Sequence, residues 1–123
     1  MLYNDYLDVI RETIHFLKKP AFIIMGKAMV SRLKPDATFP CSIEEHGFEA
    51  LCGVYNISKI PELKSNYEVM KYICSEYNCV LDFSCGFGNI IPFVLESEKN
   101  FIVSDVCKDC IAFIAEDYMG RKL

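Results

Sequence analysis

Residues 80–89 read VLDFSCGFGN, a short apolar run followed by small residues, two glycines and an asparagine. We predict that residues 79–83 form a buried strand and that the chain then turns at Gly86 and Gly88 into a helix beginning near Asn89. Glycine in such a turn permits positive φ and lets a ligand approach the backbone without a Cβ in the way. The turn therefore either binds a ligand or only connects the strand to the helix. The residues around it in the sequence distinguish the two possibilities.

The patterns around this turn predict alternating helices and strands. Ser65 and Glu68 have the spacing of a capping box, which begins a helix that runs to about residue 77. The elements expected after it are strand, helix, strand and helix, at residues 79–83, 89–96, 101–104 and 106–118. Two strands joined through a helix are typically parallel. We therefore expect an α/β part over residues 61–123.

Residues 1–60 are expected to be mainly helical. A first helix over residues 2–17 has apolar side chains three and four positions apart, at Tyr3, Tyr6, Leu7, Ile10, Ile14 and Leu17. Residues 22–33 predict a second helix, with one side formed by Met25, Met29 and Leu33.

A third, short helix is indicated by Ser42 and Glu45, which again have capping-box spacing. Gly53 is expected to close this helix. Residues 54–60 stay open between a short strand and a loop. Together with the α/β part, these elements are expected to form a single domain over residues 1–123.

Two interpretations of the glycine turn compete. In the dinucleotide fingerprint GxGxxG, Gly86 and Gly88 would be the first two glycines, but Ile91 stands at the third position. The other interpretation requires an acid in the strand before the turn and a second acid at the end of the next strand. Asp82 and Asp105 occupy those two places. Because carboxyl ends of parallel strands meet at one edge of a sheet, both acids are expected to flank the same crevice.

These residues make the sequence similar to the class I methyltransferases that use S-adenosylmethionine. The first motif of that family, VLDxxxGxG, is matched at Val80, Leu81, Asp82, Gly86 and Gly88. Asp105 matches the family's acid at the end of the second strand. The triplet SCG inside the motif also resembles adenine methyltransferases of nucleic acids. The resemblance covers residues 64–119 and implies a partial Rossmann-like methyltransferase fold.

The resemblance also implies a cofactor site for S-adenosylmethionine. Asp82, Cys85, Gly86 and Gly88 would line the methionine end of the cofactor, Asp105 would hold the ribose, and Val106 would pack on the adenine. Phe83, Ser84 and Asn89 complete the implied site. Phe83 and Phe87 flank the turn and either cover the cofactor or fill the core. Ser65 and Asn66 match a place where some DNA methyltransferases contact the cofactor's carboxylate, although an N-cap explains them equally.

The chain departs from the family in its catalytic part. The motif (Asp/Asn/Ser)-Pro-Pro-(Tyr/Phe), which holds the target amine and stacks on a flipped base, is absent from the sequence. No catalytic residue can therefore be assigned, and a non-catalytic cofactor-binding or regulatory protein is the alternative to an enzyme. A sheet of only two strands would leave open edges, so we expect a homodimer or a partner protein that completes it.

The charge distribution and the cysteine content give expectations about partners, location and redox state. The net charge is −4, yet residues 1–35 carry six basic residues against three acids. The segment from Lys18 to Lys34 holds Lys18, Lys19, Lys27, Arg32 and Lys34 with no acid among them, so it could track the phosphates of DNA or RNA or simply form a solvated face. We expect no membrane segment, a cytoplasmic location and seven reduced cysteines.

Cys107 and Cys110 form a CxxC motif, which is either a redox pair or half of a metal site. A zinc site would need two further ligands, for which Cys41, His46 and Cys52 are the candidates. No metal is expected.

Overall fold

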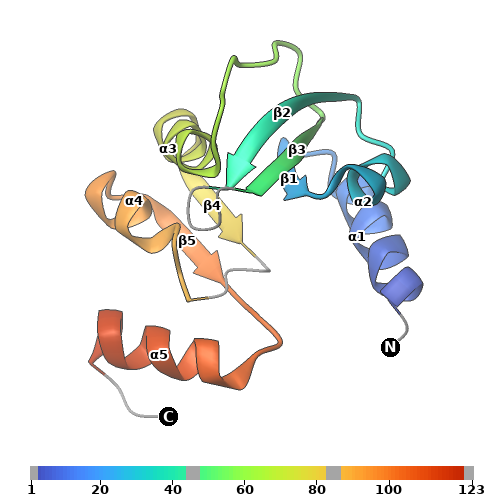
Figure 1. Cartoon of the computed structure of the whole chain (residues 1–123). Coiled ribbons are helices and arrows are strands. Elements are labelled where there is room, and N and C mark those ends of the chain that lie inside the picture. Colours follow the sequence, from blue (N-terminus) through green and yellow to red (C-terminus); the bar gives the residue numbers. More distant parts are fainter. Residues whose placement is uncertain (1–2, 44–47, 83–86, 121–123) are drawn as a thin grey trace. The chain divides into compact units, whose positions relative to one another are not determined.

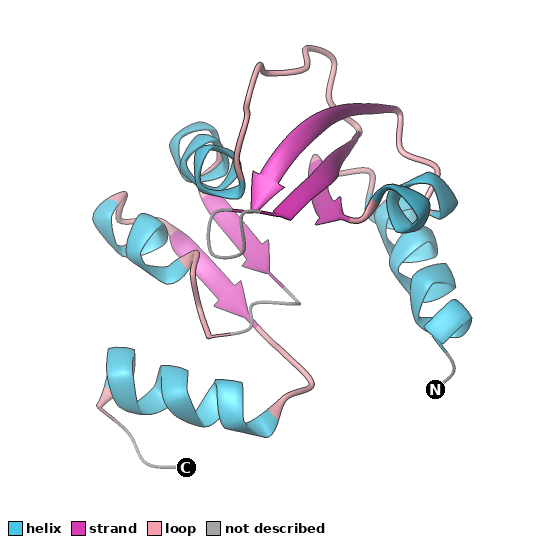
Figure 2. Ribbon diagram, in the orientation of Figure 1, coloured by secondary structure: helices cyan, strands magenta, loops and turns pink. Residues whose placement is uncertain are grey.

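A computed structural model describes residues 3–43, 48–82 and 87–120 of the chain (Figure 1). Within these residues the chain forms five helices and five strands, and the strands make two small sheets (Figure 2). The mixed α/β class expected from the sequence is confirmed. Two compact units divide the chain, Met1–Val69 (unit 1) and Met70–Leu123 (unit 2). The single domain expected from the chain's length stays a prediction.

Unit 1 is built on a three-stranded antiparallel sheet. Its elements are α1 (Tyr3–Leu17), β1 (Ala21–Met25), α2 (Lys27–Arg32), β2 (Ala37–Ile43) and β3 (Phe48–Tyr55). The strand order is β1-β3-β2, so β3 is central and pairs with both neighbours. On the outer edge of β2, the N–H of Ser42 donates to the carbonyl oxygen of Lys64 at 2.8 Å. The segment at Lys64 therefore covers part of this edge.

The core of unit 1 lies between α1, the turn after α2 and the end of β3. Leu7, Ile10 and Ile14 are buried on one face of α1 and pack with Leu33 and Tyr55. The spacing of three and four residues therefore predicted the buried positions Leu7, Ile10 and Ile14, but Leu17, expected on the same face, is 47% exposed. The hydroxyl of Tyr55 donates to the carbonyl oxygen of Leu33 at 2.8 Å, which satisfies a polar group inside the core.

The expectation that residues 1–60 are mainly helical is wrong, because three strands lie there. Ala21–Met25, AFIIM, is a strand, and only α2 after it is helical. A short apolar run does not by itself distinguish a buried strand from a helix. The helix expected after Ser42 is also contradicted at Ser42 itself, which lies in β2 and pairs with Glu49. Glu45 lies outside the described residues.

Pro40 and Gly53, residue types that are unfavourable inside strands, lie in β2 and β3. Pro40 lies inside β2, where proline is tolerated because β2 is an edge strand. Gly53 closes no helix but sits in β3, where a Cβ would lie 3.0 Å from side-chain atoms of Val30 and Pro35. The strand alternative for residues 54–60 holds only for its first two residues, because β3 ends at Tyr55.

Unit 2 has the helix-strand-helix-strand-helix order expected from the sequence. Its elements are the greater part of α3 (Asn66–Glu76), then β4 (Cys79–Asp82), α4 (Ile91–Glu96), β5 (Asn100–Val103) and α5 (Lys108–Met119). β4 and β5 are parallel, as expected, with Val80 opposite Phe101 and Leu81 opposite Ile102. The partial Rossmann-like methyltransferase fold stays a prediction, because two parallel strands do not define it.

The helices of unit 2 share one core with one face of its sheet. Buried side chains from α3, β4, the turn before α4, α4 and α5 form this core: Cys74, Val80, Ile90, Ile91, Val94 and Ile114. On the opposite face, the paired residues Leu81 and Ile102 are 54% and 68% exposed. The sheet therefore has one covered and one open face, and both strands end on the same side of the unit.

Candidate functional site

The two acids expected to flank a crevice lie at the carboxyl ends of neighbouring parallel strands. Asp82 is the last residue of β4 and pairs with Val103, the last residue of β5. The pairing continues one step further, because Ser104 N–H donates to the carbonyl oxygen of Asp82 at 2.8 Å. Asp105 follows directly. The placement at neighbouring strand ends agrees with the sequence prediction, while the crevice between the acids and the role of either acid toward a cofactor stay predictions.

Asp105 is held at the turn that leads into α5. Its Oδ1 accepts the backbone N–H of Cys107 at 2.9 Å, and the residue is half-buried. This bond fixes the carboxylate relative to the end of β5. An ionised carboxylate has about four lone-pair sites, so it can accept several donors at once.

Gly88 is required by the packing of the turn itself. It has φ +88° and is buried. A Cβ here would lie 2.6 Å from Cδ1 of Ile91 and 3.2 Å from Cγ1 of Ile114. Ile91, the residue that departs from the third glycine of GxGxxG, therefore fills the space that the absent Cβ leaves. Gly88 has a structural role that needs no ligand.

The other residues of the implied site are only partly described. Phe83, Ser84, Cys85 and Gly86 lie outside the described residues. Asn89 is exposed in the turn before α4. Val106, the residue expected to pack on adenine, is 96% exposed.

Phe87 does not fill the core, which was one of the two alternatives for it. Its side chain is 57% exposed, and its ring meets the ring of Phe113 from α5 edge to face, with centroids 5.4 Å apart. Phe113 is exposed as well. Sequence reasoning did not place Phe113 beside this turn, because no spacing rule links residues so far apart in the chain.

Ser65 serves as the N-cap of α3. Its Oγ accepts the backbone N–H of Glu68 at 3.2 Å, and the Glu68 carboxylate accepts the N–H of Lys64 at 3.0 Å. The predicted capping box is thus confirmed, with the Glu68 carboxylate on the residue before the N-cap. The N-cap explanation accounts for Ser65, and the contact of Ser65 and Asn66 with a cofactor stays a prediction.

The basic residues of the segment from Lys18 to Lys34 are all exposed. They belong to different elements: Lys18 and Lys34 are turn residues with φ of 54° and 48°, whereas Lys27 and Arg32 lie on α2. Contact of this segment with DNA or RNA stays a prediction.

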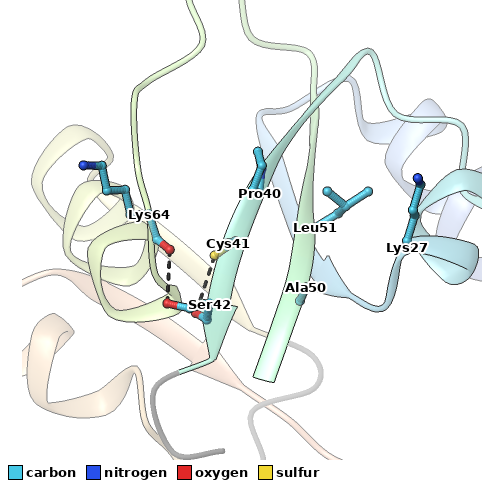
Figure 3. Close-up of a pocket in the computed structure, with 7 residues that line it drawn as sticks. All are labelled: Lys27, Pro40, Cys41, Ser42, Ala50, Leu51 and Lys64. Atoms are coloured by element: carbon cyan, nitrogen blue, oxygen red, sulfur yellow. Dashed lines mark hydrogen bonds between the residues drawn. The ribbon is translucent and has the colours of Figure 1, made fainter. Parts of the chain in front are cut away.

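Unit 1 contains a hollow that sequence reasoning did not find. It has a volume of about 530 Å³ and is lined by Lys27, Pro40, Cys41, Ser42, Ala50, Leu51 and Lys64 (Figure 3). The two lysines lie on opposite sides of it, and Ser42 Oγ donates to the carbonyl oxygen of Lys64 at 3.2 Å. Because β2 and β3 supply most of its lining, it could not be predicted from a sequence in which residues 1–60 were expected to be mainly helical.

The cysteines considered as extra metal ligands, Cys41 and Cys52, belong to the sheet of unit 1. Cys41 and Cys52 are buried on neighbouring strands, and burial, with a smaller effect from nearby Cys41, raises the pKa of the Cys52 thiol to about 12. Zinc binds the thiolate, which this burial disfavours. Across residues 3–43, 48–82 and 87–120, no three His, Cys, Asp or Glu side chains are grouped so that they could hold a metal ion. His46 lies outside the described residues.

Comparisons of the chain with protein-family models, curated proteins and solved structures found no match. No helix in the described part of the chain is long and apolar enough to cross a membrane.

Proposed function

We propose that unit 2 binds S-adenosylmethionine at the carboxyl ends of β4 and β5, as the cofactor-binding part of a methyltransferase that acts on nucleic acid. The observation that carries the proposal is the position of Asp82 and Asp105 at the ends of adjacent parallel strands, joined by the Ser104 to Asp82 hydrogen bond of 2.8 Å. Open α/β sheets bind their ligands outside the carboxyl ends of the strands.

The side chains at this edge suit the parts of the cofactor. Asp105 can accept both hydroxyls of a ribose while it keeps the N–H of Cys107. Val106 offers an exposed apolar surface that an adenine ring would cover, and burying an apolar side chain favours binding by roughly 1.5–3 kcal/mol. Asp82 can pair with the ammonium group of the methionine moiety.

The cofactor supplies an activated methyl group on a sulfonium. The chain's contribution is to bind and orient it so that the acceptor approaches in line with the breaking carbon–sulfur bond. Transfer to an amine also requires an acceptor for the amine proton, and we assign no residue to that step. The exposed basic residues of the segment from Lys18 to Lys34 are the proposed contact with DNA or RNA phosphates.

A partner or second copy would complete the sheet. Among the described residues β4 pairs only with β5, so each strand has one edge without a neighbouring strand. Folded proteins usually pair or cover such edges. A partner could also bring the proton acceptor.

A second candidate function is non-catalytic cofactor binding that regulates a partner. The absence of the (Asp/Asn/Ser)-Pro-Pro-(Tyr/Phe) motif from the sequence favours it.

Thermal unfolding with S-adenosylhomocysteine tests the binding claim. A ligand at about 100 times its dissociation constant stabilises the native state by about 2.7 kcal/mol. Each kcal/mol raises the melting temperature by about 4–8 °C for a domain of about 60–100 residues. We expect such a rise, and its absence at millimolar ligand would refute the proposal.

Transfer of labelled methyl to DNA or RNA then separates the two candidates. Labelled DNA or RNA would show that the protein is a methyltransferase. Binding of the cofactor without transfer, even in the presence of a copurifying partner, would show the non-catalytic regulatory function.

A further inference from the structure

Cys107 and Cys110 face each other across the first turn of α5. Cys107 is the N-cap of the helix, and its Sγ accepts the backbone N–H of Cys110 at 3.4 Å. Both side chains are thiols in the structure. The helical turn is already closed at this point, because Ile111 N–H donates to the carbonyl oxygen of Cys107 at 3.2 Å.

This geometry brings the two cysteines within reach of a disulfide. Residues three apart in a helix have Cα atoms about 5 Å apart. A disulfide requires a Cα separation of about 4.4–6.8 Å, so the backbone spacing of this pair permits the bond.

The two thiols differ in their access to solvent. Cys107 is exposed, whereas Cys110 is 8% exposed. A disulfide reagent from solution therefore meets Cys107 first, and Cys110 is placed to react with whatever becomes attached to Cys107. The N–H that Cys110 donates also holds Cys107 Sγ beside Cys110.

We propose that Cys107 and Cys110 form a redox-active dithiol in which Cys107 attacks and Cys110 resolves. The co-reactant is a small-molecule disulfide of the glutathione type.

In the first step the Cys107 thiolate attacks one sulfur of the co-reactant. The sulfur–sulfur bond of the co-reactant breaks, one thiolate leaves with the electron pair, and a mixed disulfide on Cys107 forms. In the second step the Cys110 thiol gives its proton to water and attacks Cys107 Sγ, which expels the second thiolate. Two protein thiols are oxidised to one disulfide, and one small disulfide is reduced to two thiols.

Cys79 is the matched control within unit 2. It is exposed like Cys107, but it lies at the first residue of β4, at the amino end of the sheet. Cys107 follows the carboxyl end of β5, so the two thiols belong to opposite ends of the parallel strands.

The test treats the full chain with glutathione disulfide and maps the products by mass. Trypsin cleaves after Lys108, so Cys107 and Cys110 fall on different peptides that stay joined only by the disulfide. We expect the joined peptides in the native protein, lighter by two hydrogens than the separate thiol peptides combined, and a retained glutathione on Cys107 in Cys110→Ser. In Cys107→Ser we expect no glutathione on Cys110 until the chain is unfolded in urea. Cys79→Ser should form the disulfide as the native protein does.

Retention of glutathione on Cys107 in the native protein without joined peptides would overturn the proposal. So would modification of Cys110 in folded Cys107→Ser at the rate seen in urea, because it would remove the asymmetry on which the order of steps depends.

Discussion

Ile91 Cδ1 lies 2.6 Å from the place where a Cβ on Gly88 would stand. Ile91 is buried in the core of unit 2, and Gly88 has φ +88°. Gly88 therefore has two roles in the turn before α4. It adopts a backbone conformation that residues with a side chain disfavour, and it leaves room for the buried side chain of Ile91. Ile91, which stands where the dinucleotide fingerprint has its third glycine, is thus the residue that requires a glycine at position 88.

Gly88→Ala should destabilise unit 2 by roughly 2–4 kcal/mol, from strain at positive φ together with overpacking against Ile91. Urea unfolding measures the change. Gly26→Ala is the matched control, since nothing lies within 4 Å of its ideal Cβ and its φ is −59°. In the Gly88→Ala background, Ile91→Val should cost less than it costs alone, because it removes the atom that clashes. Equal costs in both backgrounds would contradict the packing account.

Ser65→Ala should lower stability by about 0.5–2 kcal/mol, the usual cost of losing an N-cap. The physical reason is that the N–H of Glu68 loses the Oγ that accepts it at 3.2 Å. Thermal or urea unfolding checks the value, with the exposed Ser58→Ala as a control. Equal stability of the two variants would show that the box contributes nothing.

Stability should fall in alkaline solution. Burial first, then nearby Cys41, raises the pKa of the Cys52 thiol from 9.0 to about 12, and burial, with Asp36 next, raises the pKa of Tyr55 from 10.0 to about 12. The unfolded chain then releases these protons at lower pH than the native chain. Their stabilisation is complete below about pH 9 and is lost as pH rises toward 12, by up to about 1.4 kcal/mol per pH unit for each group.

The variant Cys52→Ala separates this effect from other titrations. Its unfolding free energy should fall less steeply with pH above about 9 than that of the native protein. Urea unfolding at a series of pH values gives both slopes, and identical slopes would contradict the role of Cys52.

The sequence predicted the elements of unit 2 better than those of unit 1. In unit 2 the helix signals and the strand signals come from separate, short segments. The capping box at Ser65, which precedes unit 2 in the chain, marks the start of α3 without reference to distant residues. In unit 1 the strand Ala21–Met25 is only five residues long and entirely apolar. Such a run shows no alternation of apolar and polar residues that would distinguish a strand from a helix. It forms a strand because it pairs with Tyr55 and its neighbours, which are far away in the chain.

The candidate site was predictable to a similar degree. Asp82 and Asp105 could be placed at neighbouring strand ends because parallel pairing follows from the order of the elements. The contact of Phe87 with Phe113, and the closeness of Cys107 Sγ to the N–H of Cys110, depend on how α5 begins and packs. The hollow of unit 1 depends on the register of β2 on β3, which a single sequence does not specify.

We propose that S-adenosylmethionine binds at the carboxyl ends of β4 and β5 through Asp105. Calorimetric titration with S-adenosylhomocysteine tests it most directly, on the native chain, on Asp105→Ala and on the control Asp109→Ala, an exposed acid in the first turn of α5. We predict saturable binding to the native chain and the control. Binding to Asp105→Ala should be weaker by about tenfold or more, the loss expected when hydrogen bonds to a charged group of about 1.5–3 kcal/mol disappear. No binding to the native chain, or equal affinity of all three proteins, would contradict the account.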